Sequence, residues 1–354
     1  MRWDSLRLTD DDGTATSGPA PLLPRGSVTR RFDTPEFRGI TFHEVTARSA
    51  LNRVPEASRM PFRWTINPYR GCSHACIYCF ARKTHEYLDL DSGHDFDSQI
   101  VVKTNVGEVL QRELARPSWT GEHIAMGTNV DCYQRAEGRY RLMPDILRAL
   151  SDVANPFSIL TKGALILRDL PLLERAADVA DVSAAVSVGC LDEDLWRLVE
   201  PGTPPPLRRL DVARTLTASG IRAGVLMAPI LPYLSDSDDQ LAATVAAVST
   251  TGATHVTPLV LHLRPGARDW WYAWLRRERP DLVPRYDDLY AGRAYAPKAY
   301  QQAITHKVRE LADRYRVGRG AISWRRGPAP DSPGTDPVRG TVPAAAAQLS
   351  LLDA

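Results

Sequence analysis

The chain has 354 residues, a formal net charge of +2 and five cysteines. A charge this close to zero excludes a strong overall field for nucleic acid, so any nucleic-acid surface must be a local patch. The odd cysteine count argues against a secreted disulfide framework. Because residues 1–8 show no secretory signal and no apolar run is long enough to cross a bilayer, we expect a cytoplasmic protein without membrane contact.

Polar stretches rich in Gly and Pro enclose the part of the chain that has the patterns of a folded protein. We expect residues 1–35 to form a flexible arm and residues 36–60 to form an extension that packs on the core. Residues 61–265 contain alternating strand and helix patterns, and residues 266–327 are expected to be mainly helical. Residues 328–354 are again rich in Pro, Ala and Gly, which predicts a disordered tail.

Within the body, short apolar or β-branched runs alternate with longer segments of helical periodicity. The predicted strands are Phe62–Asn67, Ile100–Lys103, His123–Asn129, Phe157–Thr161, Val182–Val188, Ile221–Ala228 and His255–His262. The predicted helices are Val106–Ala115, Pro144–Ala154, Leu170–Ala180, Pro206–Ala218, Asp238–Thr251 and Pro297–Tyr315. This alternation predicts an α/β fold of parallel strands joined by right-handed crossovers.

Three cysteines, Cys72, Cys76 and Cys79, follow the first predicted strand with the spacing C-x3-C-x2-C. A structural zinc site and an ordinary [4Fe–4S] site each take four protein ligands. Three thiolates can instead hold three irons of a cubane cluster and leave the fourth iron open for a small molecule. The alternative is a zinc site completed by His74 or His85, but the spacing and the flanking residues favour the cluster.

The stretch Asn67–Arg82, with Tyr78 just before the last cysteine, resembles the radical S-adenosylmethionine (SAM) motif. It is most similar to the branch of that family that includes spore photoproduct lyase and DNA repair photolyases. Similar strings further along the chain are Gly127–Gln134, Leu160–Gly163, Val199–Gly202 with Arg208 and Arg209, and Met227–Pro232. The resemblance covers residues 36 to 315.

The resemblance implies a partial (β/α)6 barrel of the TIM type with flexible N- and C-terminal extensions. Six of the predicted strands fit that barrel, and Ile100–Lys103 is then an extra element before the second barrel strand. The chemistry of such barrels lies at the C-terminal ends of the strands. The cysteine motif and the residues Thr128, Lys162 and Ser187 follow or end predicted strands, which places them at one mouth.

The same resemblance implies one [4Fe–4S] cluster on the three cysteines and SAM bound at the open iron. A one-electron donor of the flavodoxin or ferredoxin type would reduce the cluster, so that SAM gives methionine and a 5′-deoxyadenosyl radical. The residues implied to contact SAM are Tyr78, Thr128, Lys162, Ser187 and Ala228. Thr128 stands where many relatives have a Gly-Gly-Glu turn, which this chain lacks.

Two further pairs of residues have both a functional and a structural interpretation. Glu200 and Arg209 belong to the string that resembles the branch, or form a structural ion pair. Cys132 is a candidate hydrogen-atom donor to a substrate radical, as is Cys190, but free cysteines are commonly buried as small apolar residues, and burial is favoured for both.

Trp270, Trp271 and Trp274 precede Arg276, Arg277 and Arg279, so this segment could stack nucleic-acid bases and hold phosphates. The pattern favours an amphipathic helix whose aromatic residues pack on the barrel. The tail segment Gln348–Leu352 resembles the short peptide that binds the bacterial sliding clamp, although Leu352 replaces the usual aromatic residue.

Three functions are compatible with these patterns. The first is a radical SAM enzyme that acts on DNA, as a lyase in photoproduct repair. The second has the same radical chemistry on a peptide, a cofactor precursor or another small molecule, which the near-neutral charge favours. The third is a metal-stabilised adaptor without enzymatic activity that binds the sliding clamp through its tail.

Overall fold

The computed structural model describes residues 22–55, 58 and 60–318. A seven-stranded sheet forms its centre, and every neighbouring pair in it is parallel except the edge pair β3–β4. From one edge to the other the strands are β11 (Val256–Val260), β10 (Arg222–Ile230), β9 (Val182–Ser187), β8 (Phe157–Thr161), β7 (Ile124–Met126), β4 (Trp64–Ile66) and β3 (Leu51–Arg53).

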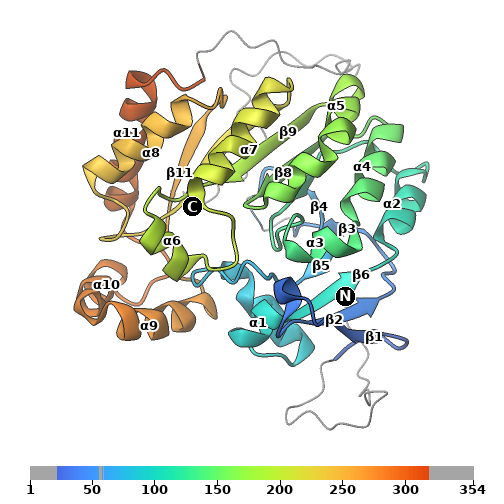
Figure 1. The fold of residues 1–354 in the computed structure, drawn as a ribbon, viewed down its shortest axis with the longest axis horizontal. Coiled ribbons are helices and arrows are strands. Elements are labelled where there is room, and N and C mark those ends of the chain that lie inside the picture. The colour runs from blue at the N-terminus through green and yellow to red at the C-terminus, as the bar shows by residue number, and fades with distance from the viewer. Residues whose placement is uncertain (1–21, 56–57, 59, 319–354) are drawn as a thin grey trace.

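Helices cover the outer face of this sheet, and Figure 1 shows several of them as a curved row beside the strands. The α-helices are α1 (His94–Ser98), α2 (Val106–Leu114), α3 (Arg135–Tyr140), α4 (Met143–Asp152), α5 (Leu170–Val179), α6 (Glu193–Val199), α7 (Pro206–Ala218), α8 (Asp238–Ser249), α9 (Ala267–Glu278), α10 (Val283–Tyr290) and α11 (Lys298–Arg314). The 3-10 helices are η1 (Pro35–Phe37), η2 (Phe80–Leu88), η3 (Ala164–Asp169) and η4 (Pro280–Leu282).

The predicted partial barrel is confirmed. Each of its six predicted strands contains or overlaps one of the parallel strands β4, β7, β8, β9, β10 and β11, and all six predicted helices are present. β9 is buried along its whole length, as expected of a parallel strand that is covered on both faces. The periodic apolar residues of α4, such as Ile146, Leu147 and Leu150, are fully buried in the core.

The predicted extra strand belongs to a second sheet of four strands, in the order β1 (Val28–Arg31), β2 (Thr41–Val45), β6 (Gln99–Lys103) and β5 (Tyr69–Arg70). The prediction of a flexible arm over residues 1–35 is therefore wrong at its C-terminal end, because β1 pairs with β2 there. Leu23, which is 1% exposed, also packs with Val45 and Leu88 in a small apolar cluster.

The segment from residue 266 to 318 is mainly helical, and two of its three tryptophans pack inside the protein. On α9, Trp271 and Trp274 are buried and stacked 4.8 Å apart, while Arg276 and Arg277 are exposed. This is the amphipathic arrangement, so these two rings are not available to stack on nucleic-acid bases. The predicted tail and its segment Gln348–Leu352 lie outside the described residues.

None of the helices in the described part of the chain is both long enough and apolar enough to span a membrane.

Candidate active site

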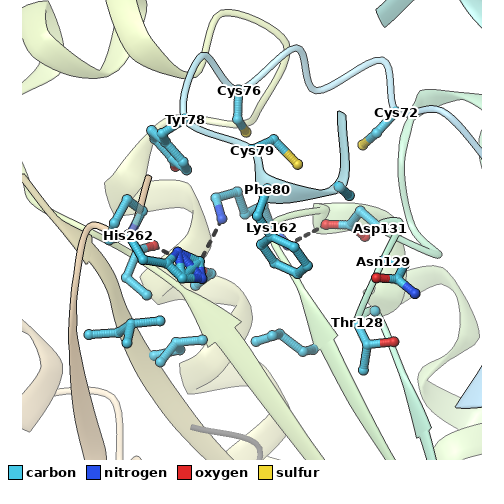
Figure 2. Close-up of a pocket in the computed structure, with 18 of the residues that line it drawn as sticks. Cys72, Cys76, Tyr78, Cys79, Phe80, Thr128, Asn129, Asp131, Lys162 and His262 are labelled. Carbon is cyan, nitrogen blue, oxygen red and sulfur yellow. Dashed lines mark hydrogen bonds between the residues drawn. The ribbon is translucent and has the colours of Figure 1, made fainter. Parts of the chain in front are cut away.

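The cysteine loop follows β5 and begins at a glycine that a larger residue could not replace without strain. Gly71 has a φ of 82°, and a Cβ at this position would lie 2.9 Å from the carbonyl oxygen of Gln99. Glycine adopts this left-handed conformation without steric cost. After this turn, Cys72, Cys76 and Cys79 line one cavity, and Figure 2 shows their side chains along one edge of it.

Arg82 fixes the loop from its C-terminal side. This side chain is fully buried, donates from Nη2 to the carbonyl oxygen of Cys76 at 2.9 Å, and pairs with Asp97 at 2.9 Å. Its guanidinium carbon lies 5.2 Å from the ring centre of Phe96 and 5.0 Å from that of Trp270. Because Trp270 belongs to α9, Arg82 connects the cysteine loop to the helical C-terminal region.

Two side chains from the segment after β7 hold the N-terminal half of the loop. Gln134 accepts a hydrogen bond from the N–H of Ser73 and donates one to the carbonyl of Gly71, both at 2.9 Å. An oxygen of Asp131 lies 3.3 Å from Nδ1 of His74. Burial alone would raise the pKa of Asp131, but His74 and hydrogen bonds from the end of β8 lower it to about 2.

The segment between α6 and α7 packs against the cysteine loop, and the two backbones are in direct contact. The N–H of Gly202 donates to the carbonyl of His74, and the N–H of Ile77 donates to that of Val199, both at 3.0 Å. A Cβ on residue 202 would lie 2.1 Å from the carbonyl oxygen of Ser73. Any side chain at this position would therefore push the two segments apart.

The cavity has a volume of about 640 Å³, and its walls include the C-terminal ends of β7, β8, β9, β10 and β11. This is the mouth at which barrels of this kind carry their chemistry. Figure 2 shows the cysteines on one side of the cavity, Thr128, Asn129 and Asp131 on another, and Lys162 near the centre of the view.

All five residues that the resemblance assigned to SAM line this cavity. Lys162 donates from Nζ to Oγ of Ser187 at 3.1 Å, and Ser187 donates to the carbonyl of Ala228 at 3.0 Å. The hydroxyl of Thr128 is buried and has no hydrogen-bond partner among the described residues. The ends of β7, β8 and β9 thus bring the ammonium group of Lys162, the hydroxyl of Ser187 and the unpartnered hydroxyl of Thr128 to one cavity.

Tyr78 connects the cavity to a buried ion pair. Its hydroxyl donates to Glu200, whose other carboxylate oxygen lies 2.5 Å from Nη2 of Arg209. The ring centre of Tyr78 is 5.8 Å from Nζ of Lys162. Burial alone would raise the pKa of Glu200, but Arg209 and Lys162 lower it below its ordinary value. Glu200 and Arg209 do form an ion pair, and that pair adjoins the cavity through Tyr78.

The structure does not bring the two remaining cysteines to the cavity. Cys132 is fully buried in the main hydrophobic core, and Cys190 is 8% exposed in a second apolar cluster. Neither residue lines the cavity. The interpretation of both as small buried apolar residues therefore has the geometry in its favour, and we assign no hydrogen-atom transfer to Cys132.

The two histidines considered as a fourth zinc ligand have other partners. His74 faces Asp131, and Nε2 of His85 lies 2.9 Å from the carbonyl oxygen of Gln99. In the described part of the chain, no three His, Cys, Asp or Glu side chains gather around one point as the ligands of a single metal ion would.

A group of four residues at the cavity mouth was missed by the sequence analysis. The ring of His262 lies 5.4 Å from that of Phe80 and 5.8 Å from that of Tyr295, and Arg264 donates from Nη2 to the hydroxyl of Tyr295 at 2.8 Å. His262 ends the last predicted strand, so the rule that strand ends carry function could have found it. Tyr295 gave no such signal in the sequence. It reaches the cavity because it forms an isolated β-bridge with His262, which is distant from it in the chain.

A family model described as the radical SAM superfamily matches residues 66–245, about half of the chain. The chain belongs to the radical SAM superfamily. The matched region includes the cysteine loop and the strands β7, β8, β9 and β10, whose C-terminal ends line the cavity. Membership of this superfamily implies a [4Fe–4S] cluster and SAM.

Relatives extend over most of the chain. An uncharacterised protein of Mycobacterium tuberculosis strain H37Rv is 50% identical over 317 residues, which cover 90% of this chain and 93% of the relative. An uncharacterised protein of Methanocaldococcus jannaschii is 28% identical over 195 residues, which cover 54% of this chain and 69% of the relative.

Solved structures of spore photoproduct lyase have the same fold. One, complexed with a dinucleoside spore photoproduct, gives a TM-score of 0.60 at 13% identity and covers 78% of this chain and 80% of its own. A mutant of that enzyme with bound AdoMet and the same dinucleoside gives a TM-score of 0.58 at 13% identity, with the same coverage of both chains. These values confirm the predicted resemblance to that branch at the level of the fold.

We expect Gly202→Ala to lower the free energy of unfolding by roughly 1–3 kcal/mol, as overpacking of a close contact does. The new methyl group would meet the backbone of Ser73 and His74, which cannot rotate away. Gly138→Ala is the matched control, because a Cβ there meets only a side-chain atom of Leu165 at 3.7 Å. Equal stability of the two variants in urea denaturation would contradict the close approach.

Proposed function

We propose that the chain is a radical SAM enzyme that holds a [4Fe–4S] cluster on Cys72, Cys76 and Cys79 and binds SAM beside it. The observation that carries this proposal is that the three cysteines and the polar residues at the strand ends line the same cavity. Three cysteines on one loop can satisfy three irons of a cubane and leave the fourth for a small molecule. Thiolates are the usual protein ligands of such clusters.

The residues present fit both groups. Burial raises the pKa of all three thiols, that of Cys76 to about 12, and coordination to a metal offsets this because a coordinating thiol is deprotonated. A cavity of about 640 Å³ lies within the usual range for small-molecule sites. When bound, the cluster and SAM together supply the reductive cleavage of the sulfonium that gives a 5′-deoxyadenosyl radical.

The side chains of the chain itself bind and orient SAM in this proposal. Lys162 provides a compact cation for the methionine carboxylate, and the unpartnered hydroxyl of Thr128 accepts a hydrogen bond from the methionine amino group. Ser187 and the backbone near Ala228 contact the ribose, and the Tyr78 segment contacts the adenine. The apolar walls from β10 and β11 limit the access of water to the reacting atoms.

We further propose that the substrate is a damaged nucleotide in DNA, bound at the mouth formed by Phe80, His262, Arg264 and Tyr295. Aromatic side chains stack on bases, and arginine pairs with phosphate. Arg264 is exposed and lies 5.8 Å from the ring centre of Phe80. The fold shared with spore photoproduct lyase, a structure of which holds a dinucleoside photoproduct, supports this choice.

Anaerobic reconstitution with iron and sulfide, followed by dithionite and SAM, should yield 5′-deoxyadenosine from the wild-type protein and none from Cys76→Ala. The alanine removes one of only three thiolates. Cys190→Ala is the control, since that thiol does not line the cavity, and it should form the product at the wild-type rate. Product from Cys76→Ala, or zinc without product in the wild-type protein, would contradict the proposed enzyme and favour the adaptor.

The affinity of the reconstituted protein for a UV-irradiated oligonucleotide should fall steeply with salt, because phosphate contacts release counterions. Arg264→Ala should weaken binding and reduce the slope of log K against log[salt] by about 1. The control is Arg277→Ala, which removes an exposed arginine of α9 that does not line the cavity. Binding that is insensitive to salt and to Arg264 would favour a peptide or small-molecule substrate.

A further inference from the structure

Two groups of the same composition contact the segment that carries the cysteines, each a tyrosine, a buried glutamate and an arginine. In the first, before the loop, Tyr69 donates to Glu137 at 2.5 Å, and Glu137 pairs with Arg168 at 2.5 Å. In the second, within the loop, Tyr78 donates to Glu200, and Glu200 pairs with Arg209. The two glutamates are 0% and 4% exposed.

The two groups differ in what lies beyond the arginine. Arg168 turns to Asp169 and to the backbone of Glu137, and no member of its group lines the cavity. Arg209 instead donates from Nη1 to the carbonyl of Ser187 at 2.7 Å.

Hydrogen bonds continue from Ser187 to the other candidate SAM contacts. Its hydroxyl accepts from Lys162 and donates to the carbonyl of Ala228. A single chain of contacts therefore runs from Tyr78 through the ion pair to the ends of β8, β9 and β10. It joins four of the five residues assigned to SAM, and both residues of the pair lie behind the cavity wall.

We propose that Glu200 and Arg209 are positioning residues, which set the ring of Tyr78 and the end of β9 at the separation that SAM requires. This inference rests on the proposed function. Glu200 acts through the hydroxyl of Tyr78, and Arg209 acts through the backbone of Ser187. Neither residue touches the cavity itself.

The position of the Glu200–Arg209 pair, rather than its burial, separates it from a purely structural pair. Burying an ion pair costs desolvation energy that the attraction between the charges repays only in part, so such pairs are poor stabilisers of a fold. The Tyr69 group shows how the chain uses the same three residue types away from the cavity. The Tyr78 group differs because both of its ends reach residues that line the cavity.

The test is a double-mutant cycle on SAM binding, since such a cycle measures the coupling between two residues. Tyr78→Phe, Glu200→Gln and the double variant are reconstituted without oxygen. The dissociation constant of SAM is then measured by equilibrium dialysis, and the melting temperature is measured beside it. Cluster-free samples are titrated with S-adenosylhomocysteine and followed by thermal shift, which gives a readout that does not depend on turnover.

Tyr78→Phe keeps the ring and removes only the hydroxyl, so we expect it to fold and to weaken SAM binding about tenfold, the effect of losing one hydrogen bond to a charged group. Glu200→Gln should weaken binding to a similar extent, and the double variant should be no weaker than Glu200→Gln alone. Tyr69→Phe is the matched control, which should lower the melting temperature and leave the SAM dissociation constant within twofold.

Unchanged SAM affinity in Tyr78→Phe would overturn the inference, as would effects of the two substitutions that simply add. If Glu200→Gln does not fold, the comparison of Tyr78→Phe with Tyr69→Phe still decides the matter. These outcomes differ from failure of the proposed function, in which the wild-type protein itself would bind no SAM.

Discussion

The cysteine loop depends on buried polar side chains that reach it from other parts of the fold. Cys72, Cys76 and Cys79 lie on a stretch with few backbone hydrogen bonds of its own. Arg82 and Gln134 supply the missing partners, and the approach of Gly202 closes the outer face. Because an unpaired buried polar group is costly, each of these contacts restricts the loop to one position.

The fixed loop places the three cysteines at a set position relative to the ends of the barrel strands. The parallel strands fix where their C-terminal ends lie, and those ends carry Thr128, Lys162 and Ser187. The loop needs a fixed position relative to the same ends, and Asp131 provides one link by contacting both His74 and the end of β8. The pair Glu200–Arg209 provides another link, from Tyr78 of the loop to the backbone of Ser187 at the end of β9. A site that positions a reactive group needs this kind of supporting shell.

The sequence could predict the parallel strands and their helices because these segments have periodic patterns, and the strands in turn locate the strand ends. The closure of the strands into a partial barrel was implied by the resemblance to the radical SAM family. The short strands β1, β2, β3 and β5 were missed, since two to five residues give little period to detect. β4 and β7 are as short, but each lies within a longer run of strand pattern. Tyr295 and Arg264 were missed for a different reason. Their place at the cavity mouth comes from pairing between segments that are distant in the chain. Cys132 was considered because it follows a strand, but the turn after β7 directs it into the core.

The central claim is that the polypeptide supplies three thiolates and leaves one iron open to SAM. Electron–nuclear double resonance on the reduced, reconstituted protein with SAM labelled at its amino nitrogen and carboxylate oxygens tests this directly. We predict hyperfine coupling of both labels to the cluster, which requires direct coordination of SAM to an iron. A cluster whose spectrum is unchanged by SAM, or a metal enclosed by four protein ligands, would contradict the account.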